Sequence, residues 1–248
     1  MAGVRSGVVF TAEEREHLRD ALVSVAGSDP RITGAALTGS SAAGGEDRWS
    51  DIDLALAIAD EADFGQAIAD WTDRMYREHG AIHHVDVTRG GTVYRVFLLA
   101  STLQVDLAFS PAAEFGAIAP TFRLLFGTAL AQPAASAPDA AQLIGLGWLY
   151  ALHARSSIAR GRVWQAEYFV SGVRDHVLAL ACLRHGEPAV EGRGIDRLPP
   201  EVTTAAAGAL VCSLDLAEIR RAFGVASEAL LLEIAEADAG LANRVVGP

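Results

Sequence analysis

The stretch AALTGSSAAGGEDRWSDIDLALAI, residues 35–58, decides which fold the sequence predicts. One apolar run ends at Gly39-Ser40, and the next begins with Asp51-Ile52-Asp53. Side chains alternate between the two faces of a strand, so a strand over residues 51–58 places both carboxylates on one face. Neighbouring carboxylates repel each other unless a cation compensates them. The pattern therefore predicts a metal site; an acidic loop leading into an ordinary strand is the alternative.

The residues between the two runs are suited to phosphate. Gly39 lets the backbone approach a phosphate group closely, and a helical turn beginning here offers free N–H groups. Ser40 and Ser41 can add hydroxyl donors. A glycine–serine pair alone is a weak signal because such pairs are common in turns. Its position before Asp51 and Asp53 gives it weight.

A third acid is needed to hold two Mg²⁺ ions, and the sequence offers two candidates. Asp106 is the one acid in the alternating run Leu103–Phe109 (LQVDLAF). An aspartate inside an apolar strand is unfavourable unless it is paired or bound to a metal. Asp86, in HHVDVT, is the competitor, and it too lies in a predicted strand.

Composition limits the classes of function. The chain has 248 residues, 51% of them hydrophobic and 21% charged, which predicts a globular protein of one large or two small domains. Its net charge of −11 disfavours binding to a nucleic-acid backbone. All 20 basic residues are arginine, so arginines, backbone N–H groups, hydroxyls or metal have to hold any phosphate.

Location is predicted from what the sequence lacks. No apolar run approaches the ~20 residues of a membrane helix. The N-terminal MAGVRSGVVFTAEERE is charged too early for a signal peptide. Cys182 and Cys212 are far apart, without metal-ligand spacing, and are expected to be core thiols. We therefore expect a cytoplasmic protein that does not bind membranes.

Periodicity predicts an α+β fold with two domains. A capping box at Thr11–Glu14 opens a first helix. The expected elements that follow are strands 32–37 and 51–58, a helix at 62–79, strands 83–87, 94–99 and 103–109, and helices 140–159, 163–185, 201–212 and 215–240. Residues 129–139 are rich in Ala, Pro and Ser and are predicted to be a linker. We thus expect a mixed sheet with helices over residues 1–130 and a helical bundle over 139–248.

Glycine-serine followed by two spaced acids resembles the signature of the DNA polymerase beta-like nucleotidyltransferase superfamily. The resemblance is specific over residues 32–109 and general beyond 139. It implies that a third carboxylate on a neighbouring strand completes the metal site. Asp106 matches that place in order and context, whereas Asp86 comes one step too early and is interpreted as solvated or structural.

The helical half resembles that of small-molecule nucleotidyltransferases, the aminoglycoside and lincosamide enzymes of antibiotic resistance. Glu167, Ser171 and Arg174 recur at i, i+4 and i+7, which places them in one polar stripe of a helix. The resemblance implies that Glu167 is the general base and that Arg174 meets the triphosphate. Asp106 is the alternative base, and an exposed ion-paired helix face is the alternative interpretation of the stripe.

The sequence thus predicts an Mg²⁺-dependent nucleotidyltransferase that moves AMP from ATP, or another nucleoside monophosphate from its triphosphate, to a hydroxyl of a small molecule. The acidic chain favours a cationic, aminoglycoside-like acceptor. A protein-modifying adenylyltransferase is one alternative, disfavoured by the added helical half. A catalytically silent nucleotide-binding module is another, disfavoured by the three acids. Monomer and homodimer are both open.

Overall fold

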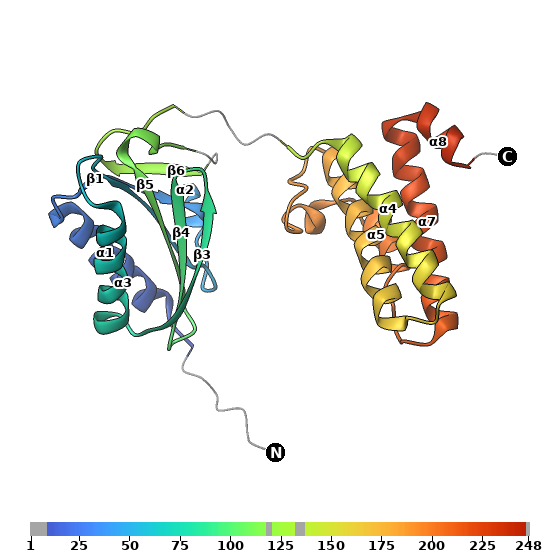
Figure 1. The fold of residues 1–248 in the computed structure, drawn as a ribbon, viewed down its shortest axis with the longest axis horizontal. Coiled ribbons are helices and arrows are strands. Elements are labelled where there is room, and N and C mark those ends of the chain that lie inside the picture. The colour runs from blue at the N-terminus through green and yellow to red at the C-terminus, as the bar shows by residue number, and fades with distance from the viewer. Residues whose placement is uncertain (1–8, 118–120, 132–136, 247–248) are drawn as a thin grey trace, which may run out of the picture. The chain divides into compact units, whose positions relative to one another are not determined.

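The computed structural model describes residues 9–117, 121–131 and 137–246. The beginning of the N-terminal segment and the centre of the predicted linker lie outside the described residues. The chain divides into two compact units, with the boundary between residues 135 and 136 (Figure 1). Each unit has its own hydrophobic core.

The first unit is a six-stranded sheet with helices. Its elements are α1 (Ala12–Ser28), β1 (Ile32–Thr38), α2 (Gly39–Ala43), β2 (Ile52–Ile58), α3 (Phe64–Glu78), β3 (Ala81–Arg89), β4 (Thr92–Leu99), β5 (Gln104–Pro111), the 3-10 turn η1 (Ala112–Glu114) and β6 (Phe122–Phe126). The strand order is β3-β4-β5-β2-β1-β6. The β2–β5 pair is parallel and the other pairs are antiparallel, so the sheet is mixed, as predicted.

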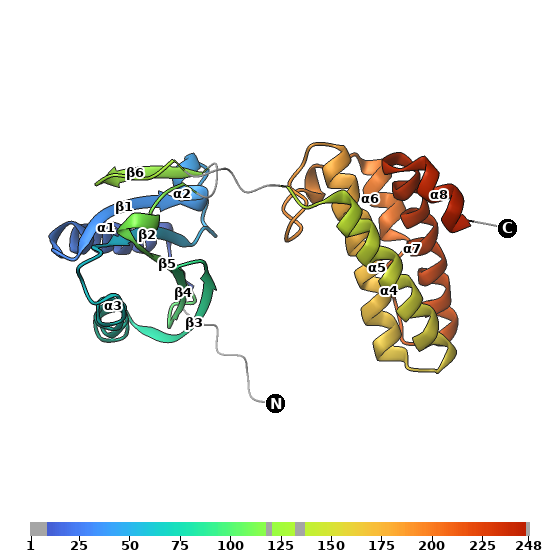
Figure 2. The ribbon, with the colours of Figure 1, turned by 45° about the horizontal axis from the view of Figure 1, so that its top comes forward.

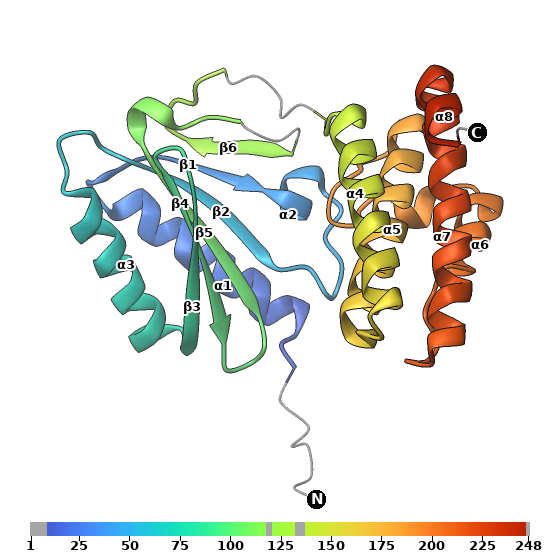
Figure 3. The ribbon, with the colours of Figure 1, turned by 45° about the vertical axis from the view of Figure 1, so that its right-hand side comes forward.

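Both long helices of this unit, α1 and α3, lie on one face of the sheet (Figures 2 and 3). Leu22 of α1 and Trp71 of α3 are buried there in one core with side chains of the central strands, such as Leu54 and Leu107. Because strand side chains alternate, the neighbours of these core residues emerge on the opposite face. On that opposite face, Ala36, Ala55, Ala57 and Phe115 form a small buried cluster.

The start of one strand and the presence of another differ from the prediction. Strand β2 begins at Ile52, so Asp51 precedes it. Strand β6, with the sequence FRLLF, was not predicted. It is a short edge strand that is stabilised by pairing with β1. Its five residues alone are too few to predict a strand.

The second unit is helical. Its elements are α4 (Ala140–Ala159), α5 (Val163–Arg184), the 3-10 turn η2 (Ile195–Arg197), α6 (Pro200–Ala207), α7 (Leu216–Ala237) and α8 (Ala239–Val246). Helices α4, α5 and α7 enclose a core that includes Ile144, Val173 and Ile219. Helices α4 and α5 approach closely at Gly172, where an added Cβ would lie 2.2 Å from Cδ2 of Tyr150.

Two helix predictions were too long. The helix expected over 201–212 ends at Ala207. The helix expected over 215–240 is interrupted at Asp238, whose backbone is extended and whose side chain accepts a hydrogen bond from N of Leu241 (2.9 Å). Asp238 thereby caps α8, as an aspartate at a helix start commonly does.

The cysteines differ in environment. Cys182 is buried as predicted, but Cys212 is exposed, so the expectation of two core thiols was wrong for Cys212. Within the described residues, no helix combines the length and the apolar character needed to cross a membrane.

Candidate active site

The parallel pairing of β2 with β5 brings two of the predicted acids together. Asp53 and Asp106 are direct partners in the register of these strands. Ile52, Leu54 and Leu107 beside them are fully buried in the core under α1 and α3. Alternation therefore places both aspartates on the opposite face of the sheet. The predicted strand geometry of Asp53 is confirmed, and Asp106 is its neighbour.

Asp51 joins the pair from the loop before β2. Carboxylate oxygens of Asp51, Asp53 and Asp106 all lie within 4.8 Å of one another, and all three residues are part-buried. Nε2 of Gln104 donates to Oδ1 of Asp106 (3.0 Å) and is 3.3 Å from Oδ2 of Asp51. One amide group therefore bridges two carboxylates and offsets part of their repulsion.

Without a cation, ionisation of this cluster is unfavourable. Burial, with the negative charge of Asp51 acting in the same direction, raises the pKa of Asp106 from its ordinary 3.8 to about 6. The hydrogen bond from Gln104 opposes that shift. A divalent cation favours the ionised form of each acid. Three carboxylates at this spacing are the oxygen ligands that Mg²⁺ prefers, so the residues fit a Mg²⁺ site.

Gly39 touches the acid cluster directly. Its backbone is left-handed (φ +59°), and a Cβ on it would lie 2.0 Å from Oδ2 of Asp53. Any other residue would therefore both strain the backbone and displace that carboxylate. The phosphate role inferred from sequence stays a prediction; the structure adds that Gly39 makes room for Asp53.

The short helix α2 begins at Gly39, where the sequence predicted a helical turn. The hydroxyl oxygens of Ser40 and Ser41 are shielded from solvent, and neither has a hydrogen-bond partner among the residues that the structure describes. Buried hydroxyls without partners are unfavourable, so each calls for an explanation such as a role in function. The nucleotide-binding role predicted for Ser40 and Ser41 stays a prediction.

Asp86 lies apart from the cluster. Its carboxylate accepts two hydrogen bonds from Arg95, 2.7 Å from Nε and 2.6 Å from Nη2. Those hydrogen bonds lower the pKa of Asp86. Arg95 also donates to Thr72 of α3, so the pair belongs to the face of the sheet that carries the helices. The interpretation of Asp86 as structural agrees with this pairing.

Glu167 and Arg174 lie on α5 in the second unit. Oε1 of Glu167 accepts a hydrogen bond from Ser171 (2.7 Å), as the i, i+4 spacing predicts. Arg174 donates from Nε (3.1 Å) and Nη2 (2.8 Å) to Oδ1 of Asp175. The polar stripe exists, and its arginine is already engaged by a carboxylate. The roles of both residues stay predictions.

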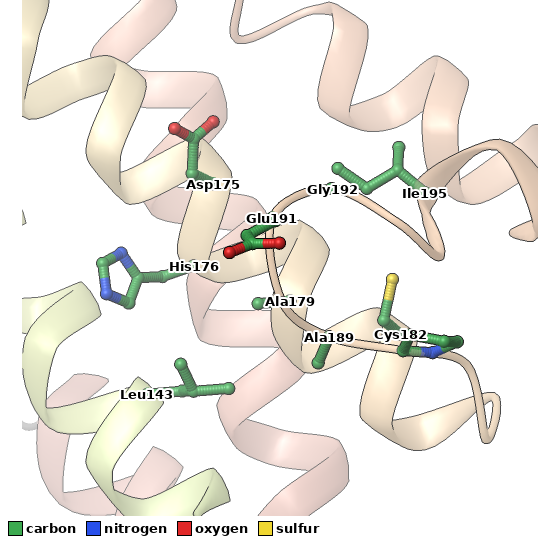
Figure 4. A pocket seen from close by; sticks show the side chains of 10 residues that line it. Leu143, Asp175, His176, Ala179, Cys182, Ala189, Glu191, Gly192 and Ile195 are labelled. Carbon is green, nitrogen blue, oxygen red and sulfur yellow. The ribbon is translucent and has the colours of Figure 1, made fainter. Parts of the chain in front are cut away.

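The second unit contains a cavity of about 420 Å³ between α4, α5 and the loop that follows α5. Figure 4 shows Asp175 and His176 of α5 on one side of it and Glu191 of the loop on another. Its remaining walls are mainly apolar, from Leu143, Ala179, Cys182, Pro188, Ala189, Gly192 and Ile195. The size is within the range of small-molecule pockets. Neither Glu167 nor Arg174 lines it.

Two residues that contact the acid cluster or the loop before it were not singled out from the sequence. Gln104 is two residues from Asp106, so the period of a strand alone places both on one face. Arg15 of α1 is only 2% exposed and contacts the loop before Asp51. The sequence signal for Arg15 was its position in the helical repeat, because it is buried on the same helix as Leu22 and Ala26.

Solved structures of nucleotidyltransferases are similar to this chain. An aminoglycoside 6-adenyltransferase from Bacillus subtilis is 13% identical, with 92% of this chain and 91% of that chain covered and a TM-score of 0.39. A nucleotidyltransferase-like protein from Exiguobacterium sibiricum 255-15 is 14% identical, with 90% of this chain and 77% of that chain covered and a TM-score of 0.37. No family model matches the sequence, and no curated protein matches it.

Proposed function

We propose that this protein is an Mg²⁺-dependent nucleotidyltransferase that transfers AMP from ATP to a hydroxyl group of a small molecule. The observation that supports this most strongly is the meeting of Asp51, Asp53 and Asp106 within 4.8 Å of one another. Two of these acids are direct partners on parallel strands, and Gly39 packs against one of them. The sheet therefore holds two of the carboxylates, and the glycine–serine turn lies beside Asp53.

Each residue has a separate task in this proposal. Asp51, Asp53 and Asp106 hold the metal. The hydroxyl groups of Ser40 and Ser41 donate hydrogen bonds to the phosphates. When bound, a pair of Mg²⁺ ions neutralises the triphosphate and lowers the pKa of the acceptor hydroxyl.

The acceptor oxygen forms a bond to the α-phosphorus while the bond to pyrophosphate breaks in line. The proton of that hydroxyl passes to a carboxylate, either Asp106 or Glu167. Asp106 is the candidate within the cluster itself, beside Asp51 and Asp53. Glu167 is the candidate from the second unit, and Arg174 is proposed to meet the triphosphate.

The acceptor we propose is a cationic molecule with hydroxyl groups, for which an aminoglycoside antibiotic is the example. The support is electrostatic: the chain has a net charge of −11, which attracts cations over its surface. A lincosamide, with one amine, is the natural comparison. Activity toward either would make this an antibiotic-resistance enzyme.

The test is release of pyrophosphate from ATP with Mg²⁺ and a panel of aminoglycosides and lincosamides. The variant Asp53→Asn keeps the shape of the side chain and is expected to lose more than about 100-fold in rate, since it removes a charge that acts on the transition state. Asp73→Asn is the matched control, because Asp73 is 72% exposed on α3 and outside the cluster. Equal rates for Asp53→Asn and wild type would overturn the metal assignment.

Two further outcomes separate the alternatives. ATP labelled at the α-phosphate that labels protein, and no small acceptor, would identify a protein-modifying adenylyltransferase. Tight ATP binding without turnover on any acceptor would identify a silent nucleotide-binding module.

A further inference from the structure

The third acid of the cluster is held differently from the other two. Asp53 and Asp106 are partners in the β2–β5 ladder, so the sheet itself determines their separation. Asp51 stands just outside, because β2 begins at Ile52. The position of its carboxylate therefore depends on the loop before the strand, residues 46–50.

This loop is folded into a tight turn by its own side chains. Asp47 accepts a hydrogen bond from N of Trp49 (2.8 Å) and donates its own N–H to Oγ of Ser50 (2.9 Å). The N–H of Ser50 returns to the carbonyl of Asp47 (3.3 Å). Such local bonds close a turn, but they do not attach it to the rest of the unit.

Arg15 attaches the turn to α1. Its Nη1 donates to the carbonyl oxygens of Asp47 and Ser50, the second at 3.5 Å. The Ser50 carbonyl belongs to the peptide group that leads into Asp51. At the other end of the loop, Glu46 accepts a hydrogen bond from Arg19 of α1 (2.8 Å from Nη1), and Nε of Arg15 is 3.6 Å from the same carboxylate.

The burial of Arg15 is costly for the fold. Its side chain is 2% exposed, and its Nε makes no hydrogen bond to the described residues. A buried charge with incomplete hydrogen bonding opposes folding, and an apolar side chain often serves stability as well or better. Arg15 lies on the buried side of α1 with Leu22 and Ala26, where a leucine would extend the apolar stripe. Stability alone therefore does not account for an arginine here.

We infer that Arg15 is a positioning residue that holds Asp51 in the acid cluster through the turn at residues 46–50. This inference rests on the proposed metal site of the nucleotidyltransferase. Removing the arginine should leave Asp53 and Asp106 in register and release only Asp51. The metal then loses one of its three carboxylates, although no ligand has been substituted.

The experiment compares Arg15→Gln with Arg31→Gln. Arg31 also joins a loop to a helix of the first unit, with hydrogen bonds to Asp29 and Asp70, but it does not contact the turn. Calorimetric titration with Mn²⁺ gives the metal affinity, and hydrogen exchange without metal gives the protection of amides 46–52. We expect Arg15→Gln to weaken Mn²⁺ binding about 10- to 100-fold, as loss of a supporting group around a metal ligand typically does. Exchange at residues 46–52 should rise, while Arg31→Gln changes neither.

A double variant tests whether the effect passes through Asp51. Asp51→Asn should weaken Mn²⁺ binding, and adding Arg15→Gln to it should weaken binding no further, because the coupled ligand is already lost. If Arg15→Gln does not fold, Ser50→Ala removes the hydroxyl that accepts the N–H of Asp47 and loosens the same turn, and the same loss of Mn²⁺ affinity is expected. The inference alone is overturned if Arg15→Gln binds Mn²⁺ as tightly as the wild type does. It is also overturned if Arg31→Gln weakens Mn²⁺ binding as much as Arg15→Gln does. A wild type that binds no Mn²⁺ overturns the proposed function and the inference with it.

Discussion

Replacing Asp106 by asparagine should make the metal-free protein more stable at neutral pH. Burial raises the pKa of this carboxyl to about 6, so its ionised form is disfavoured in the folded state. Asparagine has the same shape and keeps an oxygen that can accept the hydrogen bond from Gln104. The substitution therefore removes the unfavourable charge and little else.

The size of the effect follows from the pKa. The difference between 3.8 and about 6 corresponds to at most about 3 kcal/mol, at about 1.4 kcal/mol for each tenfold change in the proton equilibrium. Asp106 is only part-buried, and solvent screens a charge in that position. We therefore expect a gain of about 1–2 kcal/mol in the free energy of unfolding, or roughly 3–8 °C in Tm.

The pH dependence gives the sign. Below pH 3.8 the carboxyl is protonated in both the folded and the unfolded state, so the wild type bears no penalty there. As the pH rises from about 4 to about 6, the unfolded state ionises first, and the wild type loses stability relative to the variant. Above pH 6 the difference is complete.

Differential scanning calorimetry in the presence of a chelator measures this. The Tm of Asp106→Asn should exceed that of the wild type at pH 8 and approach it at pH 3. Adding Mg²⁺ should raise the Tm of the wild type at pH 8 and leave the variant nearly unchanged, since a ligand stabilises the state that binds it. A variant that is less stable than the wild type at pH 8, or a difference that is the same at both pH values, would refute the reasoning.

Three other predictions concern single residues. Gly39→Ala should cost about 1–2 kcal/mol of stability and also weaken Mn²⁺ binding in a calorimetric titration; Gly44→Ala, at a similar φ of +67° in open space, should show the stability loss alone. Glu191→Gly should raise the free energy of unfolding in urea by up to about 1 kcal/mol, because Glu191 has a φ of +53°; a lower free energy of unfolding counts against this. Glu167→Gln should reduce kcat at least about tenfold with ATP affinity retained, whereas an unchanged kcat would exclude Glu167 as the base.

The spacing of residues predicted the acid pair and its third member for different reasons. Asp51 and Asp53 were found because a period of two and a glycine–serine turn are local signals. Asp106 was found because an acid within an apolar strand needs a partner. That its partner is Asp53, in parallel register, depends on which strands meet, and periodicity contains no information on that. The resemblance to known nucleotidyltransferases implied only that a third carboxylate lies on a neighbouring strand.

What the sequence did not reveal is mostly non-local. Strand β6 forms because it pairs with β1. The contact of Arg15 is with a loop more than thirty residues later in the chain. Its place on the buried side of α1 was a signal, but an arginine there is equally compatible with an exposed helix edge. Gly39 was assigned to phosphate from its type, whereas its contact with Asp53 required coordinates.

The parallel pairing of β2 with β5 has a consequence for how the first unit folds. These neighbouring strands are separated along the chain by α3, β3 and β4, so they can meet only after a long loop has closed. Loop closure reduces chain entropy before the contact repays it, and contacts of high sequence separation slow folding. The β3–β4 hairpin is local by comparison and should form earlier. The acid cluster is then among the last features to assemble. The time at which metal binds during refolding would therefore report when the sheet is complete.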